Sequence, residues 1–252
     1  MLQRKKHPVK PAQVRRSPAR GKSLLHEQLA QSIGGRILAG AYAPGDQLPN
    51  EAAWCEEFRV SRTAVREAIK TLGGKGLLIS RPKIGSIVEP RARWNLLDRD
   101  VLGWHYAAIN RAEFLDATQE ARRLIEPGIA SLAATKHKPN QLQQLKSALE
   151  DMRNARSAGD VVEPDVRFHA ALLDCTNNEF IAPFAIVIEH TLGNLFDFTT
   201  RNNPKPESVI PLHEAVVNAV VRANAAEARE AMLRLLDDTD AVIAAGTESA
   251  NP

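Results

Sequence analysis

The chain has 252 residues, of which 44% are hydrophobic and 25% are charged, and its formal net charge is +3. This length suits one or two domains, and the apolar content is sufficient for a buried core. No apolar run reaches about 18 residues, and no apolar stretch follows the basic N-terminus, so we expect neither a membrane span nor a secretory signal. The two cysteines lie in different predicted domains, which disfavours a disulfide. A cytoplasmic protein with no membrane partner is expected.

Charge is distributed unevenly along the chain. Residues 1–22 carry eight Lys or Arg and no acid, residues 23–93 carry ten against seven, and residues 94–252 carry fifteen against twenty-three. Because the first segment also has few large apolar side chains, we expect a disordered basic arm over 1–22. Two roles for the arm are open, a nonspecific grip on DNA through counterion release and a solubilising tail.

The segment from Leu48 to Lys70 predicts two short helices joined by a tight turn. The second helix has an apolar face and a separate cationic face. The apolar set is Val65, Ala68, Ile69 and Leu72, and the cationic set is Arg62, Arg66 and Lys70. Ser61 stands where an N-cap belongs, and the helix N-terminus that it opens favours an anion such as a DNA phosphate. This division of faces is typical of a helix-turn-helix.

A β-hairpin is predicted directly after these helices. Gly73-Gly74-Lys75-Gly76 ends the second helix, and the segments 77–80 and 86–88 flank the turn-prone residues 81–85. A helix-turn-helix followed by a hairpin is a winged helix, and Arg81 and Lys83 would be the DNA contacts of its wing. The alternative is an ordinary small α+β domain whose charges form a solvated face.

The remainder of the chain shows almost no strand-like alternation and predicts helices. We expect them at about residues 97–108, 113–134, 140–157, 163–176, 179–200, 209–223 and 225–244. The fold class is therefore mainly α, with an N-terminal winged helix-turn-helix and a C-terminal helical bundle. The expected domains are the winged helix at 23–90, a linker at 91–98, an effector-binding and dimerisation domain at 99–246, and a tail at 247–252.

Asp165 and His169 carry the chemistry of the second domain. They lie four residues apart and project from one face of an expected helix. If His213 from a later helix joins them, the O/N/N set suits a divalent zinc, nickel or manganese ion. Three possibilities are open: a metal-assisted pocket, a small-molecule pocket without a tightly held metal, and a buried polar network that binds neither.

Arg122 is the candidate for binding an effector carboxylate. It lies in an apolar helical pattern, where a buried arginine needs an anion. A bidentate ligand carboxylate would supply that anion, and the competing partner is Glu126, four residues along the same helix. The residues alone therefore indicate a small, anionic, polar ligand.

Residues 23–90 resemble the DNA-binding domain of GntR-type bacterial transcription regulators. The resemblance rests on Leu48-Pro49 followed by Glu51, on Val60-Ser61-Arg62-Thr63, on Val65-Arg66-Glu67-Ala68 and on Gly76-Leu77-Leu78. It implies that Ser61, Arg62, Thr63 and Arg66 contact operator DNA. The family commonly has an arginine after this glutamate, whereas the chain has Ala52, so one expected DNA contact is missing.

The second domain resembles the FCD domain of the FadR-like branch, an antiparallel helical bundle that binds a ligand. The matching segments are Glu120–Pro127, Asp165–His169, Asn178 and His213–Ala215. The resemblance implies that Arg122, Asp165, His169, Asn178 and His213 bind the effector, although Asn178 could instead cap the next helix. The family's usual further histidine ligand falls on Leu235, so that ligand is absent.

Segments around Trp54 and Trp104 resemble repressors of sugar-acid catabolism, notably those that respond to galactonate, which implies a sugar acid as effector. We therefore expect a homodimeric transcription regulator, a repressor released from double-stranded operator DNA by a small carboxylate. One rival is a metal-dependent enzyme that uses Asp165, His169 and His213, which the sequence does not support because it contains no nucleophile elbow, phosphate-binding glycine loop or HExxH motif. Another rival is a nonspecific DNA-binding protein.

Overall fold

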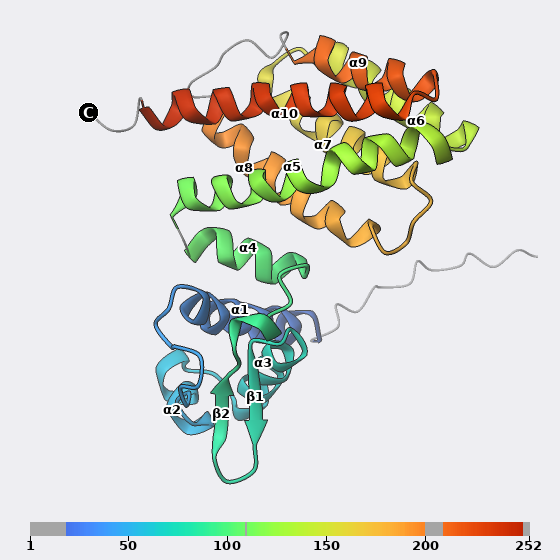
Figure 1. The fold of residues 1–252 in the computed structure, drawn as a ribbon. Helices are drawn as coiled ribbons and strands as arrows, with labels where there is room; N and C mark the ends of the chain where they lie inside the picture. Colours follow the sequence, from blue (N-terminus) through green and yellow to red (C-terminus); the bar gives the residue numbers. More distant parts are fainter. Residues whose placement is uncertain (1–18, 109, 200–208, 249–252) are drawn as a thin grey trace, which may run out of the picture.

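The computed structural model describes residues 19–108, 110–199 and 209–248. These residues are mainly helical, with one two-stranded antiparallel sheet, and they form a smaller N-terminal part below a larger helical part (Figure 1). The arrangement confirms the expected fold class. Across the part of the chain that the structure describes, no helix is both long and apolar enough to span a membrane.

The N-terminal part is a winged helix-turn-helix. Its elements are α1 (Ala19–Leu38), α2 (Glu51–Phe58), α3 (Arg62–Gly74), β1 (Leu78–Arg81) and β2 (Gly85–Val88). Asn50 and Ser61 cap α2 and α3 with their side-chain oxygens, so each helix begins where an orphan N–H is satisfied. Trp54, Val65 and Leu72 are fully buried in one apolar cluster beneath them.

The hairpin has the predicted location. Leu78 pairs with Val88 and Arg81 with Gly85, which leaves a three-residue turn. Lys83 in that turn has φ +64° and Gly85 has φ +105°, and both values belong to the left-handed region that tight turns use. The conformation of the turn therefore places Lys83 at the tip of the hairpin.

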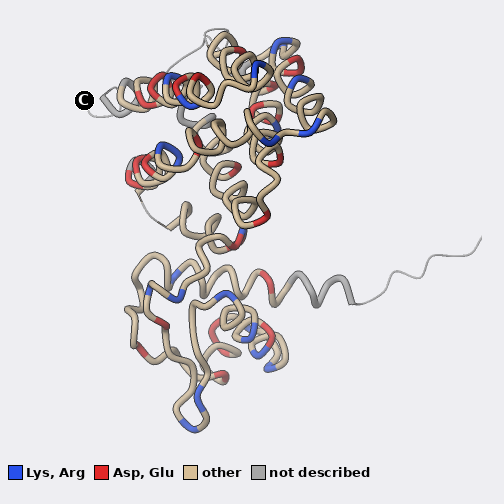
Figure 2. The backbone as a smooth tube through the Cα atoms, turned by 45° about the vertical axis from the view of Figure 1, so that its right-hand side comes forward, with Lys and Arg blue, Asp and Glu red and all other residues tan. Residues whose placement is uncertain are grey.

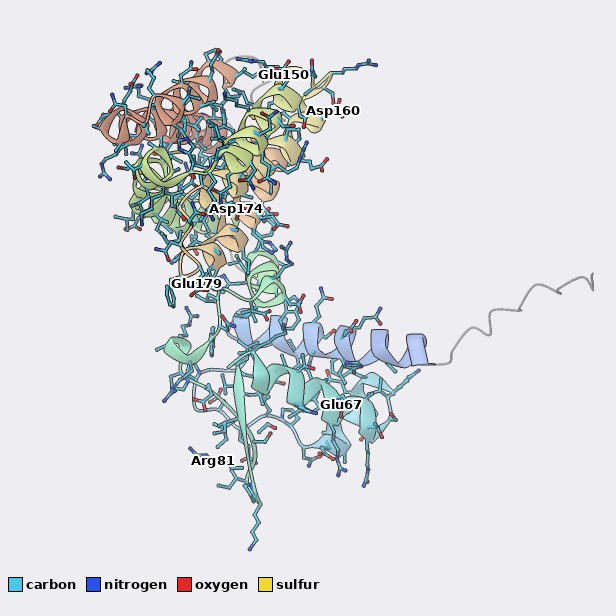
Figure 3. All side chains as sticks on the ribbon, turned by 90° about the vertical axis from the view of Figure 1, so that its right-hand side faces the viewer. Glu67, Arg81, Glu150, Asp160, Asp174 and Glu179 are labelled. Carbon is cyan, nitrogen blue, oxygen red and sulfur yellow. The ribbon has the colours of Figure 1, made fainter. Side chains whose placement is uncertain are left out.

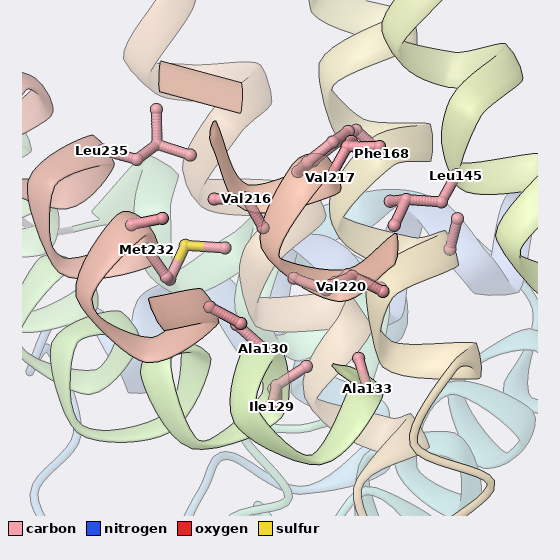
Figure 4. Packing of buried hydrophobic residues seen from close by; sticks show 14 of the residues in the cluster. Ile129, Ala130, Ala133, Leu145, Phe168, Val216, Val217, Val220, Met232 and Leu235 are labelled. Atoms are coloured by element: carbon pink, nitrogen blue, oxygen red, sulfur yellow. The ribbon is translucent and has the colours of Figure 1, made fainter. Parts of the chain in front are cut away.

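The larger part is an all-α bundle. Its helices are α4 (Arg99–Ala108), α5 (Arg111–Lys136), α6 (Pro139–Arg153), α7 (Ala158–Asp174), α8 (Ala185–Thr199), α9 (Ile210–Val221) and α10 (Ala225–Glu248), with 3-10 turns at Arg91–Arg93 and Ala182–Phe184. One apolar cluster fills the bundle, and it includes Phe168, Val216, Met232 and Leu235 (Figure 4). Burial of such a set is the main favourable contribution to folding of this part.

Several expected boundaries differ from the structure. The helix α1 begins at Ala19, so the last four residues of the expected arm are helical, because Ala, Arg and Lys favour helix; the rest of the arm lies outside the described residues. The helix α7 begins at Ala158, where the hydroxyl of Ser157 caps it, rather than at residue 163. Glu179 begins no helix, and α8 starts after the turn that contains Pro183. The expected tail at 247–252 begins within α10, and its last four residues lie outside the described part.

The helix α4 also differs from the expected organisation. Although the sequence places it at the start of the effector domain, its Val101 is buried in the apolar cluster of the winged helix, and Trp104 packs against the same cluster. Figure 1 shows α4 between the two parts of the molecule. Helical periodicity predicts that a face is buried, but it cannot identify the partner.

Candidate functional site

The recognition helix α3 separates its apolar and cationic residues as predicted. Ser61 Oγ accepts a hydrogen bond from the N–H of Ala64 at 3.3 Å, which confirms its role as N-cap. Val65, Ala68 and Leu72 are buried, and Ile69 is half-buried. The candidate DNA contacts on the other side are all exposed: Ser61, Arg62, Thr63, Arg66 and Lys70.

Arg66 is oriented by an acid from the neighbouring helix. Its Nε lies 3.0 and 2.9 Å from the two carboxylate oxygens of Glu51 in the first turn of α2. The Arg66 side chain remains 67% exposed, so the pair holds the guanidinium in place without covering it. An exposed pair of this kind contributes little to stability, and its main effect is on the direction of the side chain.

The wing adds a second cationic element. Arg81 and Lys83 are exposed on the hairpin, and Lys and Arg colour its lower end in Figure 2, while Figure 3 shows the Arg81 side chain extending from it. A groove of about 430 Å³ runs between this hairpin and the helices, and Pro49, Ile69 and Arg81 line it. The winged helix thus presents cations from two directions, an arrangement that suits the phosphates of duplex DNA.

The second candidate site lies inside the helical bundle. Asp165 and His169 project from α7 and His213 from α9, and one ligand atom of each lies within 4.8 Å of the others. Asp165 Oδ1 is 2.9 Å from His213 Nε2 and 3.5 Å from His169 Nε2. The structure thus brings together three residues that the sequence grouped. Both imidazoles are almost fully buried, with 2% and 3% exposure.

Each histidine is also held from its other ring nitrogen. His169 Nδ1 lies 2.8 Å from Glu126 Oε2, and His213 Nδ1 lies 2.9 Å from the carbonyl oxygen of Val209. Metal-binding histidines usually have such partners, because a carboxylate or carbonyl on one nitrogen directs the other toward the ion. The two Nε2 atoms point to Asp165, so the donor set fits a divalent cation.

Burial and neighbouring charges shift three pKa values in this cluster. Burial alone would raise the pKa of Glu126, but Arg122 and His169 outweigh it and lower that pKa to about 2. Burial alone would lower the pKa of His169, but Glu126 and Asp165 outweigh it and raise that pKa to about 9. Burial likewise opposes ionisation of Asp165, yet hydrogen bonds from His169 and His213 lower its pKa below the ordinary value. Without a metal, the cluster therefore balances two carboxylates with Arg122 and a protonated His169.

Arg122 is joined to the same cluster through Glu126. Its Nε lies 2.5 Å from Glu126 Oε1, and its Nη1 donates to Gln119 Oε1 at 3.0 Å. Of the two anions considered for this buried arginine, the structure provides Glu126. The sequence identified Glu126 only as the neighbour of Arg122, because its contact with His169 joins α5 to α7 and has no signal in local spacing.

Asn178 and Leu235 do not belong to this group of candidate ligands. Asn178 follows α7, and its Oδ1 accepts a hydrogen bond from the N–H of Phe180 at 3.1 Å, so it caps a turn. The sequence left open that it caps a helix beginning near Glu179, but no helix begins there, so that alternative was wrong. Leu235 is 2% exposed within the apolar core and offers no ligand atom. Among the described residues, the group with the geometry to hold a metal ion is Asp165, His169 and His213.

Comparison with known proteins identifies both parts. Residues 25–88 match "Bacterial regulatory proteins, gntR family", and residues 117–238 match the FCD domain. The HTH-type transcriptional regulator YieP of Escherichia coli is 33% identical over 84% of this chain and 92% of its own length. The galactonate operon transcriptional repressor of E. coli is 32% identical over 83% of this chain and 93% of its own length.

A solved structure shares the fold. The structure of Lar, which controls expression of the Listeria monocytogenes agr system, aligns with a TM-score of 0.56 and 15% identity over 88% of this chain and 96% of that one. At this identity the likeness concerns the fold alone. Together, the two matched domains and the relatives show that the chain belongs to the GntR family with an FCD domain, and that it is a DNA-binding transcription regulator and not an enzyme.

Proposed function

We propose that this regulator is a homodimeric repressor of a sugar-acid catabolic operon, and that a small carboxylated effector releases it from its operator. The observation that carries the proposal is a polar cluster inside the helical bundle, in which Arg122, Glu126, His169 and His213 are buried and Asp165 is partly buried. The similar repressor of the E. coli galactonate operon supports the choice of sugar acids.

The cluster has the chemistry that a sugar acid needs. Burying several charges is costly unless they are paired, so a set of this size in the middle of a core indicates a purpose other than stability. An aldonate carboxylate would compete with Glu126 for Arg122, and its hydroxyls would hydrogen-bond Asp165 and the two histidines. The effector would thus replace internal partners with its own groups.

A divalent zinc, nickel or manganese ion is a proposed part of this site. Asp165, His169 and His213 would hold it, and such an ion would supply open coordination positions for a carboxylate or hydroxyl of the effector. Because Leu235 stands where relatives place a further imidazole, we expect weaker metal binding than a four-ligand site gives. Asn178 remains a proposed effector contact that would have to leave its own turn.

Dimerism follows from the requirements of operator recognition. One recognition helix covers few base pairs, whereas two heads on a near-palindromic operator gain affinity through effective concentration and impose a half-site spacing. Effector binding would favour an arrangement in which the heads are wrongly spaced, so it would lower operator affinity by reciprocal coupling. Such a regulator acts on the chromosome, in the cytoplasm.

The test is binding of the purified protein to its own upstream intergenic DNA at physiological salt, with and without a panel of aldonates, alongside metal analysis. We expect tight binding that one aldonate releases, and loss of that release in Asp165→Asn with operator affinity preserved. The matched control is Asp151→Asn, which removes an exposed carboxylate on α6. Tight operator binding that no aldonate alters would refute the proposed effector class, and equal affinity for unrelated DNA would indicate a nonspecific DNA-binding protein.

A further inference from the structure

Three ion pairs on opposite sides of one helical turn connect the two parts of the molecule. They meet at Asp98, Arg99 and Asp100, where α4 begins. Within the described residues, α4 is the helix that packs both on the winged helix, through α1, and on the bundle, through α8 and α5. A signal between the domains therefore has this helix as its most direct physical route.

The first side of the turn holds the end of the recognition helix. Lys75, the C-cap residue of α3, places its Nζ 2.6 Å from Asp98 Oδ1 and 2.9 Å from Asp100 Oδ2. The Lys75 side chain is only 13% exposed and its Nζ lies 5.6 Å from the centre of the Trp104 ring. Asp98 is 26% exposed, so its pair with Lys75 resists screening better than a surface pair does, whereas Asp100 is 63% exposed and adds a weaker second contact.

The backbone tightens the same junction. Asn95 donates its N–H to the carbonyl of Lys75 at 3.1 Å. Gly76 has φ +75°, and a side chain at that position would place its Cβ 2.2 Å from the carbonyl oxygen of Arg93. The end of α3 and the segment leading to α4 thus form one rigid unit.

The second side of the turn reaches the bundle. Arg99 pairs with Glu189 of α8 through both ends of its guanidinium, and Nη2 lies 2.7 Å from Oε2. These side chains are 60% and 38% exposed, so the contact is weak enough to break and re-form. Ile188, the neighbour of Glu189, is buried in the same apolar cluster as Phe168, which precedes His169. A shift of α8 within that cluster would move Glu189 and so change its contact with Arg99.

We propose that Asp98, Arg99 and Asp100 form an interdomain clamp through which the effector domain sets the orientation of the recognition helix. The contacts of Lys75 with Asp98 and Asp100 make α4 move with α3. The exposed pair of Arg99 and Glu189 lets the bundle hold or release α4. The inference rests on the proposed function for the identity of the signal, but not for the existence of the clamp.

Variants can open either side without unfolding α4. Asp98 is left intact because its carboxylate also accepts the N–H groups of Asp100 and Val101 at 3.0 and 3.1 Å and so caps the helix. Asp100→Asn weakens the side toward α3, and Glu189→Gln weakens the side toward α8. Glu227→Gln is the matched control, since it breaks the exposed pair with Arg222 between α9 and α10.

The experiment compares operator affinity of the full-length variants with and without D-galactonate, or with the aldonate that acts on the wild-type protein. We expect both clamp variants to lower the ligand-induced change in operator affinity roughly fivefold or more, on the scale of ordinary allosteric coupling. Operator affinity without ligand and calorimetric binding of the aldonate should stay within about twofold of wild type, within the scatter of surface substitutions. An unchanged ligand effect in both variants would overturn the clamp.

The double variant Asp100→Asn/Glu189→Gln distinguishes a serial clamp from two separate routes. If the two sides act in series, the double variant loses no more coupling than either single variant, whereas independent routes give additive losses and contradict the proposal.

A second measurement separates the clamp from the proposed effector. If no aldonate changes operator affinity of the wild-type protein, the effector class fails, and amide hydrogen exchange then tests the clamp without any ligand. Faster exchange at Val101 and Leu102 in both clamp variants, but not in Glu227→Gln, would support the clamp. Exchange equal to wild type would overturn it.

Discussion

The two parts of the molecule use charge in opposite ways. In the winged helix, Arg62, Lys70 and Lys83 are exposed, and Arg66 remains two-thirds exposed beside its partner. In the bundle, Arg122 and Glu126 are each no more than 2% exposed and are joined to one another. The exposed cations are therefore available to a large polyanion, whereas the buried charges are already paired and must exchange partners before they can bind a ligand.

The physical cause is the cost of removing charge from water. A cation on the surface keeps its hydration until a phosphate displaces it, so it needs no internal partner. A charge in the core loses its hydration on folding and must be paired at once. Substitutions of the exposed cations should therefore change DNA affinity, whereas substitutions of the buried charges should change the free energy of unfolding.

Arg122→Ala should have the largest effect on stability. It leaves Glu126 buried without its guanidinium partner, and we expect the free energy of unfolding to fall by about 3–5 kcal/mol in chemical denaturation. The exposed substitution Arg222→Ala serves as control and should cost no more than about 1 kcal/mol. If the two losses were equal, the buried pair would not differ energetically from a surface pair. Where the Arg122→Ala protein remains folded, we expect operator binding without a ligand response.

Gly34→Ala tests how tightly α4 packs on the winged helix. A Cβ at Gly34 would lie 2.6 Å from the nearest ring carbon of Trp104, so we expect a loss of about 1–3 kcal/mol in unfolding free energy from overpacking. Gly35→Ala, one residue along the same helix, meets nothing within 4 Å and should stabilise by roughly 0.5–1 kcal/mol through helix propensity. Equal effects from the two substitutions would contradict the close contact.

Arg62→Ala or Arg66→Ala should affect DNA binding and not folding. Each is expected to weaken operator binding by about 1–3 kcal/mol if it contacts a base, as measured by fluorescence anisotropy, and to leave effector binding intact. Glu67→Gln, on the same helix and labelled in Figure 3, is the control and should not weaken binding. A fall in melting temperature that parallels the loss of binding would instead indicate misfolding.

Lys83→Ala should have the smallest effect. A lysine at the wing tip that contacts phosphate contributes equally to every sequence, so affinity should fall by the same factor for operator and unrelated DNA, with the log–log salt slope reduced by about 1. Titrations at several salt concentrations measure this slope. A loss confined to the operator would assign Lys83 a base contact.

Local patterns were sufficient for most of the secondary structure. The alternation of Val65, Ala68 and Leu72 with arginines predicted both faces of α3, and the turn residues near Gly85 predicted the hairpin. Boundaries that depend on caps and prolines were less accurate, as at Ala158 and Ala185, because a single hydroxyl or ring decides them.

The candidate sites divide in the same way. The grouping of Asp165, His169 and His213 followed from helical spacing and resemblance, and the structure brings the three together. The position of Glu126 between Arg122 and His169 was not predictable, since it depends on how α5 packs against α7. The same holds for Glu51 beside Arg66.

Local sequence patterns were enough to predict most of the helical segments, the turn of the wing and the resemblance to the family, because these depend on residues that are neighbours along the chain. Three features are visible in the folded protein alone: α4 packs on the winged helix, Glu126 links Arg122 to His169, and Lys75 and Glu189 contact opposite sides of one turn. These are contacts between side chains distant in sequence, and they are selected by shape, burial and charge balance in the folded core, which no local pattern encodes.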